Sequence, residues 1–194
     1  MAVDHVPVGR STLSFVVRRA RGRITLSVRR SGDRTPVELV FSPALPLGAH
    51  AAGTGVTVHE TLGDVHATVR TTLVDSATLG VSYSGGWSIV PPEMPPMIGD
   101  RSKAPRVLSE RLAGAGANYV VSLEGLAGRT YGFRVMAPGV TAARTLAASA
   151  SAGATVTTAG VAGAGRMIEV TFPIAGADAD GYTAAVVTIS GRRP

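Results

Sequence analysis

Apolar and polar residues alternate with a period of two along most of this 194-residue chain, and this pattern constrains the fold more than any other feature. Successive side chains of a β-strand point to opposite faces of a sheet, so the alternation predicts strands that are buried on one side. Runs with the spacing of an amphipathic helix do not accompany it. The sequence therefore predicts an all-β fold.

The best-defined hairpin is predicted from Ser11 to Arg30, with Arg21 and Gly22 as a two-residue turn. Leu13, Phe15 and Val17 would share one face of the first strand. The turn would set the apolar residues of the two strands opposite one another, Phe15 facing Val28 and Val17 facing Leu26. Agreement between register and apolar pattern makes this the strongest local prediction.

The other face of this hairpin is polar and cationic. It would display Ser14, Arg18, Arg23, Thr25, Ser27 and Arg29, with Val16 as the one large apolar residue. The chain has a formal net charge of +6, and residues 1–35, with eight arginines and two acidic residues, account for all of it. Lys103 is the only lysine, and a GC-rich genome would explain this preference for arginine over lysine. Genome composition, however, would spread the charge along the chain.

Guanidinium groups form bidentate contacts with carboxylate, sulfate and phosphate. The cationic face therefore predicts either an anionic-glycan site at Arg18, Arg23 and Arg29 or docking against an acidic neighbouring domain. Nucleic acid is not the expected partner, because the face lacks the aromatic residues that stack on single-stranded bases.

A second hairpin is predicted between Gly55 and Leu73, with a turn near residues 62–64. Its inward-facing side would carry Val56, Val58, Val65, Ala67 and Val69. Further strands are expected at Val37–Phe41, Thr78–Tyr83, Trp87–Val90, Asn118–Leu123, Thr130–Met136, Ala154–Thr158, Met167–Phe172 and Tyr182–Ser190. About a dozen short strands with Gly or Pro breaks predict a single domain, residues 1–194, folded as an antiparallel two-sheet β-sandwich, with an up-and-down barrel as the alternative.

Two stretches interrupt the alternation. Residues 91–98 contain four prolines, which fix the backbone and remove hydrogen-bond donors, so they predict a stiff extended loop. Met94, Met97 and Ile98 in this loop are expected to form an apolar interface, within the chain or with a neighbouring domain. Residues 137–165 are rich in Ala, Gly and Ser, and are predicted to cross the surface of the domain.

Catalytic and metal-binding motifs give weak signals only. His59 and His66 flank the second turn and could share a zinc ion, but no third His or Cys completes the set, so both are interpreted as surface residues. Asp178 and Asp180 resemble the start of a calcium loop, although Asp-Gly before a strand more simply predicts a turn. No catalytic residue, metal or cofactor is predicted for this chain, and Glu124 is expected to pair with Arg129 or Arg134.

Trp87 is the only tryptophan, and Tyr83 lies close to it in sequence. Exposed aromatic rings bind sugars by stacking, whereas a lone Trp in a sandwich is more often a core or interface residue. Trp87 and Tyr83 are therefore candidate carbohydrate-binding residues.

Several segments together resemble the C-terminal accessory β-sandwich of bacterial glycoside hydrolases that have a helical alpha/alpha-barrel catalytic domain, as in glycogen-debranching-type enzymes. They are residues 37–48, Gly85–Pro92, Gly99–Ser102, Arg106–Leu108, Tyr119–Tyr131 and Val170–Pro173, and the Leu-Glu-Gly-x-x-Gly-Arg-Thr-Tyr run within them is the most characteristic. The resemblance implies a non-catalytic module whose partner is the catalytic domain of the same parent protein or a polysaccharide.

The resemblance also bears on location. Such enzymes are commonly exported, so the resemblance implies an extracellular or periplasmic protein if the chain is part of a longer secreted one. The first residues lack the apolar core of a signal peptide, and a complete chain would be cytoplasmic. Its apolar runs are also too short for a membrane span.

Overall fold

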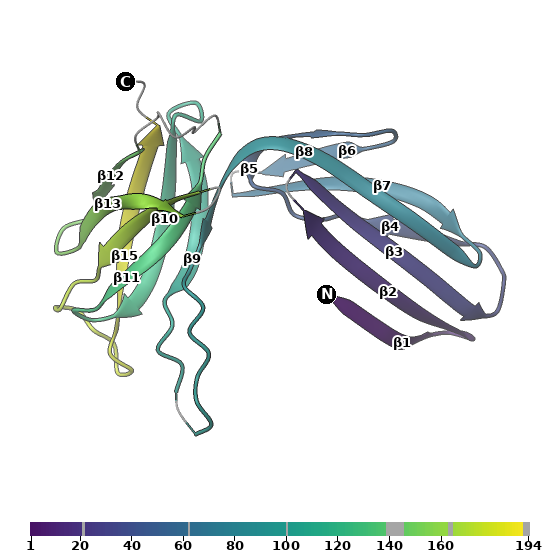
Figure 1. Cartoon of the computed structure of the whole chain (residues 1–194), viewed down its shortest axis with the longest axis horizontal. Helices are drawn as coiled ribbons and strands as arrows, with labels where there is room; N and C mark the ends of the chain where they lie inside the picture. The colour runs from purple at the N-terminus through teal and green to yellow at the C-terminus, as the bar shows by residue number, and fades with distance from the viewer. Residues whose placement is uncertain (21, 62, 100, 139–145, 163–164, 192–194) are drawn as a thin grey trace. The chain divides into compact units, whose positions relative to one another are not determined.

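The computed structural model describes residues 1–20, 22–61, 63–99, 101–138, 146–162 and 165–191, and β-strands are the only regular elements in these ranges (Figure 1). They contain fifteen strands in three antiparallel sheets, none of which closes into a barrel. The all-β prediction is confirmed. A single two-sheet sandwich of about a dozen strands is not confirmed, because three sheets are present. The described residues contain no helix that is long and apolar enough to cross a bilayer.

Contacts within the chain divide it into two compact units. Unit 1 comprises Met1–Leu45 and Ala49–Ser84, and unit 2 comprises Pro46–Gly48 and Gly85–Pro194. Strand β8 (Ser76–Val90) contributes to both units. Gly85 and Gly86, in the middle of this strand, have φ angles of 70° and 86°, a conformation that glycine adopts without steric cost. A single domain over residues 1–194 stays a prediction.

Unit 1 contains two sets of paired strands. One set runs β1 (Ala2–Val8), β2 (Ser11–Ala20), β3 (Arg23–Gly32) and the first part of β8. The other runs β4 (Val37–Phe41), β7 (Asp64–Leu73) and β6 (Thr57–Thr61). Alternate residues of β3, β7 and β8 are buried and form the core: Ile24, Leu26, Val28, Val65, Ala67, Val69, Leu73, Leu79 and Val81.

The β2–β3 hairpin has the predicted register. Phe15 pairs with Val28 and Val17 with Leu26. Arg21, the first residue of the predicted turn, lies outside the described residues. Gly22, the second, has a φ of 71°, as a tight hairpin turn requires.

The second hairpin is also present, because β6 pairs with β7 and Val58 lies opposite Ala67. Val58 therefore lies on the same side as the buried Ala67, as predicted, but half of its surface is exposed. The reason is its position in the sheet: β6 is an edge strand, and every residue in it is exposed.

Unit 2 has two layers. One contains the end of β8, β11 (Thr130–Met136), β14 (Gly165–Thr171) and β13 (Thr155–Ala162); the other contains β12 (Leu146–Ala150), β15 (Tyr182–Gly191), β10 (Asn118–Leu126) and β9 (Arg106–Ala113). Their buried faces meet in an aromatic core. Trp87 on β8 stacks on Tyr119 on β10, with ring centroids 5.4 Å apart. The rings of Tyr131 and Phe172 meet edge to face, with centroids 5.7 Å apart.

The structure adds strands that the sequence did not predict: β1, β5 (Leu47–Ala52), β9 and β12. It also joins two predicted strands, Thr78–Tyr83 and Trp87–Val90, into β8. The Ala/Gly/Ser-rich stretch 137–165 contributes two edge strands: β12, and β13, which overlaps the predicted strand Ala154–Thr158. Residues 139–145 and 163–164 lie outside the described residues. Residues 91–97 contain no strand, as their prolines predict.

Candidate functional site

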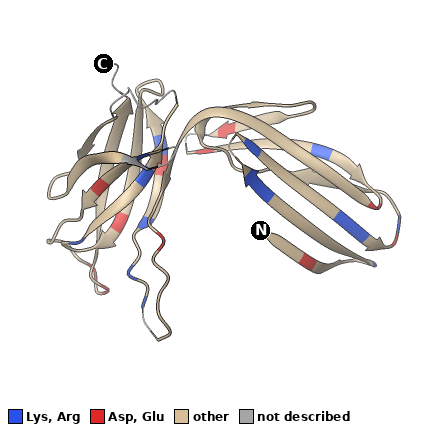
Figure 2. Cartoon of the chain, viewed as in Figure 1, with Lys and Arg blue, Asp and Glu red and all other residues tan. Residues whose placement is uncertain are grey.

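The solvent-facing side of β2, β3 and the first part of β8 forms a cationic surface in unit 1, which we name the arginine face. Cationic positions mark the end of β2 and both ends of β3 in Figure 2. The pairing of the three strands places the following residues on this surface: Ser14, Val16, Arg18, Arg23, Thr25, Ser27, Arg29, Ser76, Thr78, Gly80 and Ser82. Its three arginines, Arg18, Arg23 and Arg29, are exposed.

The positions between the arginines of the arginine face are mostly small residues, namely serines, threonines and one glycine. Ser27 on β3 and Thr78 on β8 share a hydrogen bond of 3.4 Å between their hydroxyl oxygens. The guanidinium of Arg23 lies close over Gly80, because a Cβ at Gly80 would be only 3.3 Å from Nη2 of Arg23. The face therefore presents guanidinium N–H groups and hydroxyls side by side.

The charge of the arginine face is not neutralised locally. Two other arginines of unit 1 have acidic partners, Arg34 with Asp75 at 3.3 Å and Arg70 with Glu38 at 2.9 Å. Within the described part of the chain, no ion pair involves Arg18, Arg23 or Arg29. These three side chains can therefore bind an external anion without first breaking an internal pair.

The predicted aromatic platform is not part of this surface. Trp87 is only 5% exposed and stacks on Tyr119 in the core of unit 2. A buried indole offers no ring face to a sugar, so Trp87 is a core residue. Tyr83 is half-buried in unit 1, on the same side of β8 as the buried Leu79 and Val81 and opposite to the arginine face.

The two histidines pair directly across the β6–β7 hairpin. His66 is held by the Ser42 carbonyl oxygen, 2.9 Å from Nδ1, and by Asp64, 3.1 Å from Nε2. Among the residues that the structure describes, no group of three or more His, Cys, Asp or Glu side chains could hold a metal ion.

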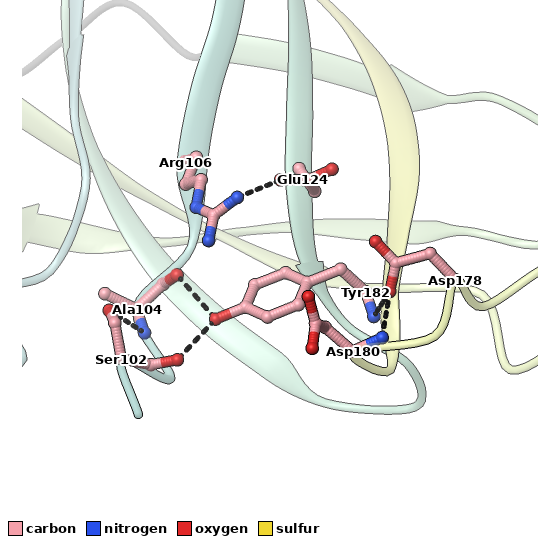
Figure 3. Close-up of polar contacts among 7 residues, drawn as sticks. All are labelled: Ser102, Ala104, Arg106, Glu124, Asp178, Asp180 and Tyr182. Atoms are coloured by element: carbon pink, nitrogen blue, oxygen red, sulfur yellow. Dashed lines mark hydrogen bonds and ion pairs between the residues drawn. The ribbon is translucent and has the colours of Figure 1, made fainter. Parts of the chain in front are cut away.

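The Asp178–Gly181 segment forms the predicted turn. A carboxylate oxygen of Asp178 accepts hydrogen bonds from the backbone N–H groups of Asp180 and Tyr182, at 2.9 and 2.8 Å (Figure 3). The carboxylate thus caps its own turn and leads the chain into β15.

A second candidate site lies in unit 2, where a cleft of about 490 Å³ opens beside β15 and the start of β9. We name it the basic cleft. It is lined by three cationic side chains and one carboxylate, together with Ser102, Leu126 and Tyr182; the charged residues are Arg101, Lys103, Arg106 and Asp180. The sequence did not predict this site.

Phenol groups fix the wall of the basic cleft. Tyr182 donates a hydrogen bond to the Ser102 carbonyl oxygen at 2.7 Å, and Tyr131 donates to the Lys103 carbonyl oxygen at 3.0 Å. These two bonds hold consecutive residues of a strand-free segment against the sheets of unit 2. Figure 3 shows Tyr182 reaching across to this segment.

Arg106 contacts both Tyr182 in the lining of the cleft and Glu124 on β10. Its guanidinium carbon lies 4.8 Å from the centre of the Tyr182 ring, and Nη1 is 3.0 Å from Oε2 of Glu124. The predicted partners of Glu124, Arg129 and Arg134, are therefore wrong. The register explains this, because β9 is the neighbour of β10 and places Arg106 directly opposite Glu124.

The predicted apolar interface is divided by the structure. Met94, itself part of unit 2, lines a small pocket of about 270 Å³ together with Leu126 and Tyr131 and is 40% exposed. Met97 is 78% exposed and Ile98 is fully exposed. The apolar interface formed by these three residues stays a prediction.

Searches against protein-family models, curated proteins and solved structures found no match to this chain.

Proposed function

We propose that this chain is a non-catalytic binding module and that its arginine face binds an anionic polysaccharide. The observation that supports this proposal is the display of Arg18, Arg23 and Arg29 on one exposed sheet face without acidic partners among the described residues. The proposal implies an extracellular or periplasmic location, since the acidic polysaccharides of cell envelopes and extracellular matrices lie outside the cytoplasm.

The spacing of the cations suits a repeating polymer. Arg23 and Arg29 lie on the same face of β3 and six residues apart, which corresponds to about 20 Å along an extended strand. Arg18 is opposite Thr25 and therefore a diagonal neighbour of Arg23. A carboxylated or sulfated chain several sugars long could contact all three guanidinium groups, while Ser and Thr hydroxyls bond to its sugar hydroxyls.

The chemistry favours a glycan over nucleic acid. Single-stranded nucleic acids gain much of their affinity from bases stacked on aromatic side chains. None of the outward positions of the arginine face is aromatic.

The proposal is tested by biolayer interferometry with immobilised heparin and polygalacturonate, and with amylose as a neutral control. We expect binding to both acidic polymers and not to amylose. Replacing Arg18, Arg23 and Arg29 together by Gln should weaken binding by roughly tenfold to a hundredfold, because each charge-assisted contact contributes about 1 kcal/mol or less at an exposed site.

A second triple variant removes the same charge elsewhere. Arg70, Arg111 and Arg134 are exposed and lie outside the arginine face, so their replacement by Gln should leave binding within about twofold of the parent. Equal losses in the two triple variants would contradict a specific face. Tighter binding of single-stranded DNA than of either acidic glycan would assign the face to nucleic acid instead.

A second candidate function is an accessory module that packs on the catalytic domain of a glycoside hydrolase. The exposed Met97 and Ile98 in a proline-rich segment favour it, because apolar side chains on a stiff loop suit a protein contact. Co-expression of this chain with the catalytic domain of the same parent protein, as two separate polypeptides, tests it. Size-exclusion chromatography follows the complex. A complex that is lost on replacing Met97 and Ile98 by Ser would support docking, and separate elution of the two unsubstituted polypeptides would contradict it.

A further inference from the structure

The geometry points to a second ligand site in the basic cleft of unit 2, built from different residues from those of the arginine face. Its ligand is a single acidic sugar unit, a uronate. This inference rests on the proposed function, because it names the sugar chemistry that an anionic-glycan module would recognise through a second set of residues.

The cations of the cleft account for the carboxylate of such a ligand. Arg101 contacts the Asp180 carboxylate at 2.9 Å, and Arg106 contacts the Glu124 carboxylate at 3.0 Å. A guanidinium has five N–H donors, so each retains donors for a further anion. Lys103 lines the same cleft, so three cationic side chains line one opening.

The remaining lining groups account for the rest of the sugar. Asp180 is an acceptor that can bind sugar hydroxyls, and Ser102 adds a hydroxyl group. Leu126 supplies an apolar surface for the C–H face of a pyranose ring. A simple anion such as acetate could use only the cations, so the mixed lining favours a ligand that carries both a carboxylate and hydroxyls.

The site is also preorganised. The phenols of Tyr182 and Tyr131 fix the backbone of Ser102 and Lys103, and Tyr182 itself is buried. Asp178 caps the turn that carries Asp180. Because the protein makes these contacts within itself, binding requires little reorganisation of the backbone. A volume of about 490 Å³ lies within the range of small-molecule sites.

The test is an NMR titration of the full chain with glucuronate, glucose and acetate. We expect glucuronate to shift the amide signals of residues 101–106 and 180–182, glucose to shift none, and acetate to bind roughly tenfold more weakly than glucuronate. Arg106→Gln and Lys103→Gln should each weaken glucuronate binding several-fold. Arg111→Gln, on the same strand as Arg106 but outside the cleft, should not.

Asp180→Asn distinguishes recognition of the sugar from recognition of a carboxylate alone. This change should reduce the advantage of glucuronate over acetate while acetate binding is kept or strengthened, because Arg101 loses its internal partner. Equal affinity of the parent chain for glucuronate and acetate, or unaltered glucuronate binding in both Arg106→Gln and Lys103→Gln, would overturn the inference.

The outcomes for the two surfaces are distinguishable. Replacing Arg18, Arg23 and Arg29 should leave glucuronate binding unchanged. Glucuronate binding without polymer binding would contradict the proposed function and leave the cleft in place, whereas polymer binding without glucuronate binding would contradict the cleft alone.

Discussion

At the scale of single residues, Tyr119 shows how a polar group is accommodated in the core of unit 2. It is the largest fully buried side chain of the described residues, and its phenol donates a hydrogen bond to Glu110 on the neighbouring strand β9. Burial, reinforced by this hydrogen bond and by the charge of Glu110, raises the pKa of Tyr119 far above its ordinary value. The phenol therefore stays neutral in the folded protein.

This pKa shift predicts a loss of stability in alkali. The unfolded tyrosine releases its proton near pH 10, whereas the folded one keeps it to higher pH, so the shift stabilises the fold fully below about pH 10 and progressively less above it. Tyr119→Phe should lower the free energy of unfolding by about 1 to 3 kcal/mol at neutral pH. The difference between the two proteins should stay constant up to about pH 10 and shrink above it. Urea denaturation measures it, and a difference that is constant with pH would contradict the prediction.

Gly125 is a second residue on which packing depends. A Cβ at Gly125, on β10, would lie 2.5 Å from Cε2 of Phe172, whose ring is buried against Tyr131. Gly125→Ala should therefore destabilise the protein by about 1 to 3 kcal/mol through overpacking.

Gly160 on β13 provides the control for this substitution. It is exposed and has no positive φ, and a Cβ added there would have no neighbouring atom within 4 Å. Gly160→Ala should be neutral or stabilising by up to about 1 kcal/mol. Thermal unfolding of both variants checks the pair; equal melting temperatures would show that Phe172 moves aside without cost.

At the scale of elements, the sequence predicts what depends on neighbouring residues. The β2–β3 register follows from period-two alternation and a two-residue turn, and β4 and β11 have the predicted bounds. The Ala-rich strands β5 and β12 were missed, because small side chains give little alternation and their place is set by pairing with β8 and β15.

The same distinction separates the two sites. The arginine face was predictable because its three arginines lie on one hairpin, where alternation alone places them on a common side. The basic cleft was not, because its Arg101–Asp180 pair joins residues 79 positions apart. Only the tertiary pairing of β9, β10 and β15 brings such residues together.

At the scale of the whole molecule, the charge distribution decides between specific and general attraction to polyanions. The chain carries a formal net charge of +6, and residues 1–35 account for it, so the net charge and the arginine face largely coincide in sequence. A surface that neutralises discrete charges on a polymer releases their counterions, and its affinity then falls linearly with the logarithm of the salt concentration.

The slope of this dependence provides the last prediction. Each lost contact between an arginine and an anionic group should reduce the slope by roughly one or less, so replacing Arg18, Arg23 and Arg29 by Gln should flatten the heparin salt dependence by up to about three. Replacing Arg70, Arg111 and Arg134 removes the same charge at positions outside the arginine face, and should lower affinity slightly at low salt while the slope stays close to that of the parent. Heparin affinity measured over a series of sodium chloride concentrations provides the comparison. Equal flattening in both variants would mean that net charge, and not the arginine face, holds the polymer.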